Sequence, residues 1–181
     1  MTNIVIVGVC GAGKSTLAVA LSEQLAMPRR SIDELRGDYA EQFGYSAERA
    51  EQLYQTHGAV AFHEYVCRLD ALLVRHFLRS GDRQIIDGSG GVVCDQGLSL
   101  WRRRTPAMWV VVEPGSPQEL KRRLAAQRGP DDEQWRASGG EQVNDSIARA
   151  VEQLTPTVDL RYNSLTDAPA KVAAALSRWA A

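Results

Sequence analysis

A glycine-rich loop between an apolar run and a helix-forming stretch is the feature that most constrains this chain. The apolar run is Ile4-Val5-Ile6-Val7, and directly after it stand Gly8-Val9-Cys10-Gly11-Ala12-Gly13-Lys14-Ser15. These residues fit the Walker A pattern G-x-x-x-x-G-K-[ST]. Apolar residues then recur at helical spacing as far as Ala26, and Pro28 stops the pattern. The order of strand, loop and helix predicts an α/β protein with this loop at the end of a buried parallel strand.

The residues of the loop favour binding of a polyphosphate with Mg²⁺. Glycines let the backbone turn several N–H groups toward one point, and the following helix adds its positive end. Lys14 adds a charge between the β- and γ-phosphates, and the Ser15 hydroxyl is a ligand for the metal. The predicted nucleotide site comprises Gly11, Ala12, Gly13, Lys14, Ser15 and Thr16. A glycine-rich turn without a ligand is the alternative, and the position of the loop between strand and helix argues against it.

The rest of the chain alternates strands with helices. Strands are expected at residues 29–32, 84–87 and 107–113, and near 160–164. Helices are expected after residue 33, over 46–80 with a break at Gly58, and over 116–126, 143–154 and 169–179. No repeat or linker divides the 181 residues, so we expect one domain, 1–181. Its fold class is α/β, a P-loop NTPase-type parallel sheet of about five strands with helices on both faces.

The near-neutral charge of the chain limits the classes of partner that it can attract. The formal net charge is −1, so no general positive field attracts nucleic acid or anionic lipid, and any anion must be held locally. The run Arg102-Arg103-Arg104 lacks interleaved aromatic residues and is more typical of a solvated helix end. The first residues carry no basic leader, and their apolar run is too short for a membrane span. We therefore expect a cytoplasmic protein without nucleic-acid or membrane partners.

The cysteines give no sign of a disulfide framework or a zinc site. Cys10, Cys67 and Cys94 are scattered, with no Cys-x-x-Cys pair and no histidine ligands recognised nearby. A reducing compartment fits this usage best.

Over nearly its whole length the chain resembles the shikimate kinase-like branch of P-loop small-molecule kinases. The matching segments are residues 8–16, Ile32-Asp33-Glu34-Leu35, Phe62-His63, Ser89-Gly90-Gly91-Val92-Val93, Pro117 to Leu124, and Arg128-Gly129-Pro130. The resemblance implies transfer of the γ-phosphate of ATP, with Mg²⁺, to a hydroxyl of a small metabolite. Residues 127–141 are polar and contain glycines, which predicts a mobile lid, and a helical substrate-binding segment is expected over about 34–80. The expected oligomeric state is a monomer or a homodimer.

The resemblance assigns acidic residues to the reaction. Asp33 matches the family's aspartate that contacts the acceptor hydroxyl, so it is a candidate catalytic and substrate-binding residue. The family's metal-organising acid falls on Ser31, which leaves Asp87 after the third strand as the substitute. For Asp87, a role as a turn residue before Gly88 is the open alternative.

Further positions complete the expected site. Gly90 and Gly91 match glycines that let substrate lie against backbone amides. Arg128 matches the lid arginine that covers the phosphates, and Arg123 and Pro169 match the residues on the two faces of adenine. For the two arginines, a solvated helix face remains the alternative.

Two positions depart from the family pattern. The arginines that grip the shikimate carboxylate fall on His63 and Leu154. Neither imidazole nor an alkyl group replaces a bidentate guanidinium, so shikimate is not expected to be the preferred acceptor. His63 then contacts a different polar group of the substrate or is an ordinary helix histidine.

The second hypothesis for the function, beside a small-molecule kinase, is a nucleotide-dependent regulatory or binding module without a small-molecule acceptor.

Overall fold

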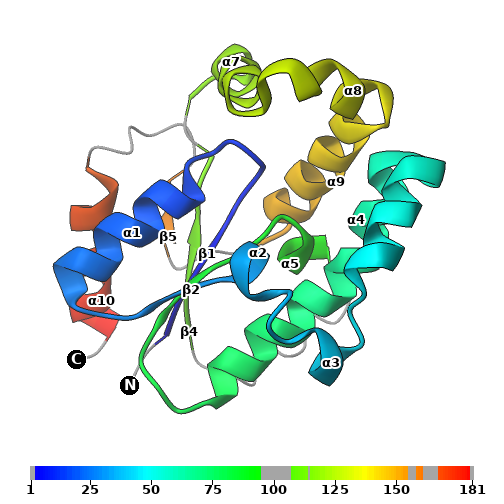
Figure 1. Ribbon diagram of the computed structural model, residues 1–181. Coiled ribbons are helices and arrows are strands. Elements are labelled where there is room, and N and C mark those ends of the chain that lie inside the picture. The colour runs from blue at the N-terminus through cyan, green and yellow to red at the C-terminus, as the bar shows by residue number, and fades with distance from the viewer. Residues whose placement is uncertain (1–2, 95–106, 114, 155–157, 161–166, 180–181) are drawn as a thin grey trace.

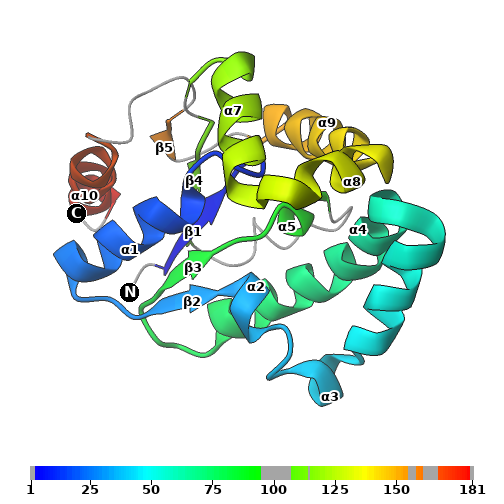
Figure 2. The same cartoon turned by 45° about the horizontal axis from the view of Figure 1, so that its top comes forward.

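A five-stranded parallel sheet forms the centre of the protein (Figures 1 and 2). The computed structural model describes residues 3–94, 107–113, 115–154, 158–160 and 167–179. The strands are β1 (Asn3–Val7), β2 (Arg29–Ser31), β3 (Ile85–Asp87), β4 (Ala107–Val111) and β5 (Val158–Asp159), in the order β2-β3-β1-β4-β5. Because β1 lies between β3 and β4, the glycine-rich loop that follows it leaves the middle of the sheet. The α/β prediction is confirmed.

Helices cover both faces of the sheet. On one side, α1 (Lys14–Leu25) packs against α10 (Ala168–Trp179); on the other lie α4 (Ala47–Arg79), α5 (Gly91–Cys94) and α9 (Gly140–Glu152) (Figure 1). Every residue of β1, β3 and β4 is buried, as the apolar runs predict for strands covered on two sides. Burial of each large aliphatic side chain contributes about 1.5–3 kcal/mol. This core fixes the strand ends from which the site is built.

The long helix α4 bends at Gly58. This glycine has φ 79° and ψ −172°, a conformation outside the helical region that is almost restricted to glycine. The break leaves the N–H of Ala59 without a helical partner, and it donates instead to the carbonyl of Ser138 at 2.8 Å. Ser138 follows α8 (Asp132–Ala137), so the bend joins α4 to the segment predicted as a lid.

Substitution of Gly58 tests this junction. A Cβ at position 58 would lie 2.4 Å from the carbonyl oxygen of Ser138, and the backbone conformation itself resists a side chain. We expect Gly58→Ala to lower the free energy of unfolding by about 1–3 kcal/mol, measured by urea denaturation. Gly37→Ala is the control, because a Cβ there meets nothing within 4 Å, and its effect should stay within about 0.5 kcal/mol. Equal stability of the two variants would contradict this account of the bend.

The region predicted as a lid is largely helical. Helix α7 (Pro117–Arg128) leads into a 3₁₀ turn at Gly129–Asp131, then into α8 and α9. Helix α7 ends at Arg128, two residues after the expected end at 126. Helix α9 begins at Gly140, three residues before the expected start at 143. Polar residues and glycines suggested a loop there, but Pro130 stands in the first turn of the 3₁₀ segment, where its missing N–H is tolerated. Movement of this lid stays a prediction.

Two strand predictions need adjustment. Strand β2 ends at Ser31, and Ile32 begins the short helix α2 (Ile32–Leu35), so Asp33 lies in the first turn of a helix. Within the described residues the last strand is β5 at Val158–Asp159, which pairs with Val110 and Val111 and begins two residues before the expected start at 160. The Leu160 N–H still donates to the carbonyl of Val111 at 2.9 Å, and residues 161–164 lie outside the described part of the chain.

A further short helix, α3 (Ala40–Phe43), precedes α4. No helix among the described residues has the length and apolar character needed to cross a membrane.

Candidate functional site

The loop after β1 has the backbone of a phosphate-binding turn. Its glycines Gly8, Gly11 and Gly13 all have positive φ, at 152°, 76° and 95°. Gly8 also lies against Val112, the residue after β4, where an added Cβ would be 2.0 Å from the carbonyl oxygen. Lys14 opens α1 and donates from Nζ to the carbonyl of Val9 at 3.1 Å. The lysine is thereby held at the loop, where its charge is available to an anion.

A cavity of about 460 Å³ adjoins this loop. Of the residues predicted to bind nucleotide or metal, all but Ala12 and Pro169 line it, namely Gly11, Gly13, Lys14, Ser15, Thr16, Asp87 and Arg123. The predicted catalytic residues Asp33 and Arg128 line it too, whereas the Ala12 side chain is buried in the core. The carboxyl ends of parallel strands meet at one edge of a sheet, which explains why segments far apart in the chain converge here. The volume lies within the usual range for a small-molecule site.

Asp87 is the buried carboxylate of this cavity. Its side chain is only 4% exposed, and its Oδ2 accepts hydrogen bonds from Nε and Nη2 of Arg29 at 3.1 and 2.7 Å. Arg29, on β2, also contacts Glu34. The ion pair holds the Asp87 carboxylate in place at the edge of the cavity. With the Ser15 hydroxyl, which lines the same cavity, the carboxylate provides the hard oxygen donors that suit Mg²⁺.

A second cavity, of about 560 Å³, lies between α2, α4, α5 and α9. The residues predicted to bind the acceptor, Asp33, His63, Gly90 and Gly91, all line it. Lys14 and Asp33 line both cavities. Aromatic side chains complete its wall, namely Tyr54, Phe62 and Trp135.

Three charged side chains that line the second cavity, Asp70, Arg36 and Asp33, form two consecutive ion pairs. Asp70, on α4, is fully buried and accepts a hydrogen bond from Nε of Arg36 at 2.8 Å. Nη2 of Arg36 donates to the exposed carboxylate of Asp33, also at 2.8 Å. The Ser89 hydroxyl donates to the second oxygen of Asp70. Arg36 thus holds the predicted catalytic carboxylate in place from one side.

For Asp70 and Arg36, burial and ion pairing shift the pKa in opposite directions. Burial raises the pKa of Asp70, although the charge and hydrogen bond of Arg36 oppose the shift. Burial also disfavours the charge on Arg36, but the attraction of Asp70 and Asp33 outweighs it and raises the pKa of the guanidinium. The cost of burying Asp70 is therefore offset only while Arg36 remains its partner.

Sequence reasoning missed both Asp70 and Arg36. A signal for Asp70 was present: Val66, Leu73 and Val74 stand three or four residues from it along α4 and form an apolar helix face. An aspartate on such a face has to be paired if it is buried. The partner, 34 residues earlier, could be found only in three dimensions.

Removing Asp70 should destabilise the protein. In Asp70→Ala the guanidinium of Arg36 and the Ser89 hydroxyl lose their buried partner, and we expect a loss of about 3–5 kcal/mol in the free energy of unfolding. Asp82→Ala removes an exposed carboxylate and should change stability by no more than about 0.5 kcal/mol. Denaturant titration measures both variants. A loss below about 1 kcal/mol in Asp70→Ala would show that the buried pair is unimportant for stability.

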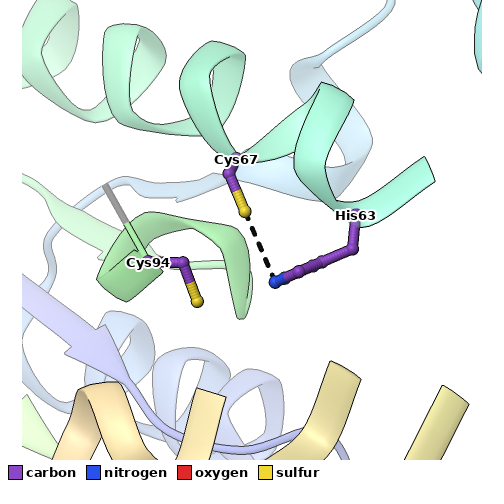
Figure 3. A group of neighbouring side chains, drawn as sticks. All are labelled: His63, Cys67 and Cys94. Carbon is purple, nitrogen blue, oxygen red and sulfur yellow. Dashed lines mark hydrogen bonds between the residues drawn. The ribbon is translucent and has the colours of Figure 1, made fainter. Parts of the chain in front are cut away.

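His63 lies in a cluster with two cysteines (Figure 3). Its Nε2 is 3.3 Å from Sγ of Cys67 one turn along α4, and the Cys94 side chain, from α5, lies beside them with its sulfur within 4.8 Å. Hydrogen bonding from Cys67 and the neighbouring His63 lowers the pKa of Cys94 to about 5, whereas the same pairing and burial raise the pKa of Cys67. The expectation of scattered cysteines without a histidine neighbour is therefore wrong. His63 stands four residues before Cys67 on α4, and the packing of α5 on α4 brings Cys94 beside both.

The other residues predicted for the site, Arg128, Arg123 and Pro169, do not share one set of neighbours. Arg128 stacks on Trp135, with Cζ 3.4 Å from the ring centroid, and Arg123 donates to Glu119 at 2.8 Å. Pro169, near the start of α10, lines neither cavity, so its contact with adenine stays a prediction. Leu154 packs against the core, and Thr155, Pro156 and Arg102 to Arg104 lie outside the described residues.

The comparisons with known proteins agree with this architecture. The family model described as "AAA domain" (AAA_18) matches residues 4–144, a span that includes the loop and most of both cavities. Among curated proteins, none matches the sequence significantly.

Several solved structures resemble this one along the whole chain. A shikimate kinase from Bacteroides thetaiotaomicron has a TM-score of 0.59 at 22% identity, with 98% of this chain and 95% of that one covered. For a shikimate kinase from Acinetobacter baumannii in complex with shikimate, the TM-score is 0.62 at 18% identity, covering 98% and 94%. A gluconokinase from Sinorhizobium meliloti 1021 gives 0.55 at 16%, covering 99% and 93%. At these identities the likeness establishes the fold. The chain belongs to the AAA domain family AAA_18 and has the P-loop fold that the shikimate kinases share.

Proposed function

We propose that the protein is an ATP-dependent phosphotransferase that transfers the γ-phosphate to a hydroxyl group of a small metabolite. One observation carries the proposal: Lys14 and Asp33 line both the cavity at the phosphate loop and the cavity beyond it. A donor in the first and an acceptor in the second would meet at these two side chains. Phosphoryl transfer needs this kind of placement together with charge neutralisation, and little covalent chemistry from the protein.

Each residue has a defined task in this proposal. The loop N–H groups and Lys14 bind the phosphate oxygens, and Lys14 neutralises charge that develops on the transferred group. Ser15 and Asp87 would hold Mg²⁺, which supplies further positive charge to the phosphates when bound. Asp33, oriented by Arg36, accepts the proton of the acceptor hydroxyl. Arg128, from the segment over the loop cavity, adds charge and helps exclude water.

The charges of the acceptor cavity support an acceptor without a carboxylate. The cations Lys14 and Arg36 are matched there by the carboxylates of Asp33, Glu51 and Asp70. Arg36 is already engaged by two of those carboxylates, so it does not offer a carboxylate ligand the full guanidinium fork. Aromatic walls and backbone at Gly90 and Gly91 suit a small polyhydroxylated or partly apolar molecule.

An acceptor screen tests the proposed function. Purified protein is incubated with Mg²⁺ and either ATP or GTP and with pools of sugars, nucleosides, hydroxyl amino acids and hydroxy acids, shikimate included. Products are detected by the mass gain of one phosphate. We expect an acceptor-dependent product from a compound other than shikimate. Nucleotide-controlled binding of a protein partner, with no phosphorylated small molecule from any pool, would overturn the proposal in favour of a regulatory module.

A further inference from the structure

We infer that His63, Cys67 and Cys94 form a binding site for one Zn²⁺ ion at the wall of the acceptor cavity. The ligand atoms are Nε2 of the histidine and Sγ of each cysteine, and all three lie within 4.8 Å of one another. Figure 3 shows the three side chains gathered in one place, with His63 and Cys67 on α4 facing each other and Cys94 on α5 beside them. This inference concerns metal binding and does not depend on the proposed kinase reaction.

The distances between the atoms suit a single small ion. On a tetrahedral zinc, a sulfur and a nitrogen ligand are about 3.6 Å apart and two sulfurs about 3.8 Å apart, given bond lengths of about 2.3 and 2.05 Å. The observed separation of 3.3 Å between Cys67 Sγ and His63 Nε2 is close to that spacing. The remaining separations, at most 4.8 Å, exceed these spacings by no more than about 1.2 Å, which χ1 rotations shared between the two cysteines can remove.

The two helices that carry the ligands are held together independently of any metal. His63 and Cys67 stand four residues apart on α4, so they share one face of the helix. Helix α5 is fixed against that face by the hydrogen bond from Ser89 to Asp70 and by the close packing of Gly91. A Cβ at Gly91 would lie 3.0 Å from Cα of Cys67 and 2.7 Å from the Asp70 carboxylate. Cys94 is therefore placed by the fold, and little rearrangement is needed to bind an ion.

The chemistry of the ligands selects the metal. Two thiolates and an imidazole are soft or borderline ligands, which favour zinc over Mg²⁺ and Ca²⁺. Three protein ligands leave one position of a tetrahedral zinc for water or another small ligand. Because His63 also lines the acceptor cavity, a bound ion would place positive charge at the wall of that cavity.

Metal titration of the reduced full-length protein tests the site. We expect one Zn²⁺ per chain by metal analysis after dialysis, and Co²⁺ should give the absorption bands of a tetrahedral site with thiolate ligands. Cys67→Ser and Cys94→Ser should each weaken binding by at least about 10²-fold. Cys10→Ser and His57→Gln are the matched controls, because Cys10 lies in the phosphate loop and His57 is exposed on α4, and both should bind zinc as tightly as the parent.

A second measurement uses only the parent protein, so it does not depend on whether the variants fold. Zinc should protect Cys67 and Cys94 from alkylation while leaving the rate at Cys10 unchanged, as read by peptide mass spectrometry. Equal protection of all three cysteines, or none, would overturn the site. So would zinc binding that persists in both serine variants. Formation of a Cys67–Cys94 disulfide in air, in a protein that takes up no zinc when reduced, would assign the cluster to redox chemistry instead.

Discussion

Replacing Lys14 with alanine is expected to reduce phosphoryl transfer by at least about 10³-fold, the largest effect of any single substitution in this protein. The side chain stands at the phosphate loop and at the junction of both cavities. Its charge balances the oxygens of the transferred group, and in a site shielded from water no solvent cation replaces it. The loss should appear in kcat as well as in the affinity for nucleotide. Steady-state kinetics with the acceptor found by the screen measures both.

The control for this variant is Lys171→Ala. Lys171 is exposed on α10 and lines neither cavity, and its loss removes the same charge from the chain. It should leave turnover within about twofold of the parent. The stability of Lys14→Ala should also be close to that of the parent, since the one hydrogen bond from Nζ goes to a loop carbonyl. Turnover by Lys14→Ala at the parent rate would remove the phosphate loop from the mechanism.

Asp33→Asn is expected to lower kcat by about 10²-fold or more while leaving the KM for ATP nearly unchanged. Asparagine keeps the shape of the side chain but loses the negative charge that accepts the acceptor proton. The Asp33 side chain is 69% exposed, so its ion pair with Arg36 contributes little to stability. The variant should therefore unfold at the same denaturant concentration as the parent. A kinetic defect without a stability defect separates a catalytic role from a structural one.

Asp38→Asn provides the comparison. Asp38 is exposed five residues further along, and it lines neither cavity. Its substitution removes the same charge and should leave kcat unchanged. If Asp33→Asn retains the parent kcat, Asp33 does not act as the base, and the proton must leave to another group or to water.

The nucleotide half of the site was predictable from the sequence because its parts are contiguous. Gly8 to Ser15 combine a strand end, a turn that needs positive φ and a helix start, and each has a local signature. The order of alternating strands and helices likewise predicted the parallel sheet, since few topologies accommodate it. The contact of Arg29 with this site was not predicted, because its pairing with Asp87 depends on the register of β2 against β3.

The acceptor half was predictable only in part. Asp33, His63, Gly90 and Gly91 were identified by resemblance to a family, and they do line one cavity. The resemblance could not reveal Arg36 and Asp70. It also did not reveal the cysteine cluster, because His63 and Cys67 indicate a metal site only when Cys94 lies beside them.

The sequence by itself determined the phosphate loop, the succession of elements and the core strands, because hydrophobic periodicity and turn chemistry are local properties of the chain. The tertiary structure alone decided which charges meet and which metal ligands gather. Buried carboxylates and thiolates are tolerated only beside specific partners, and those partners are brought together when α2, α4 and α5 pack against one another. The character of the acceptor cavity is for this reason a property of the packed helices rather than of any one segment.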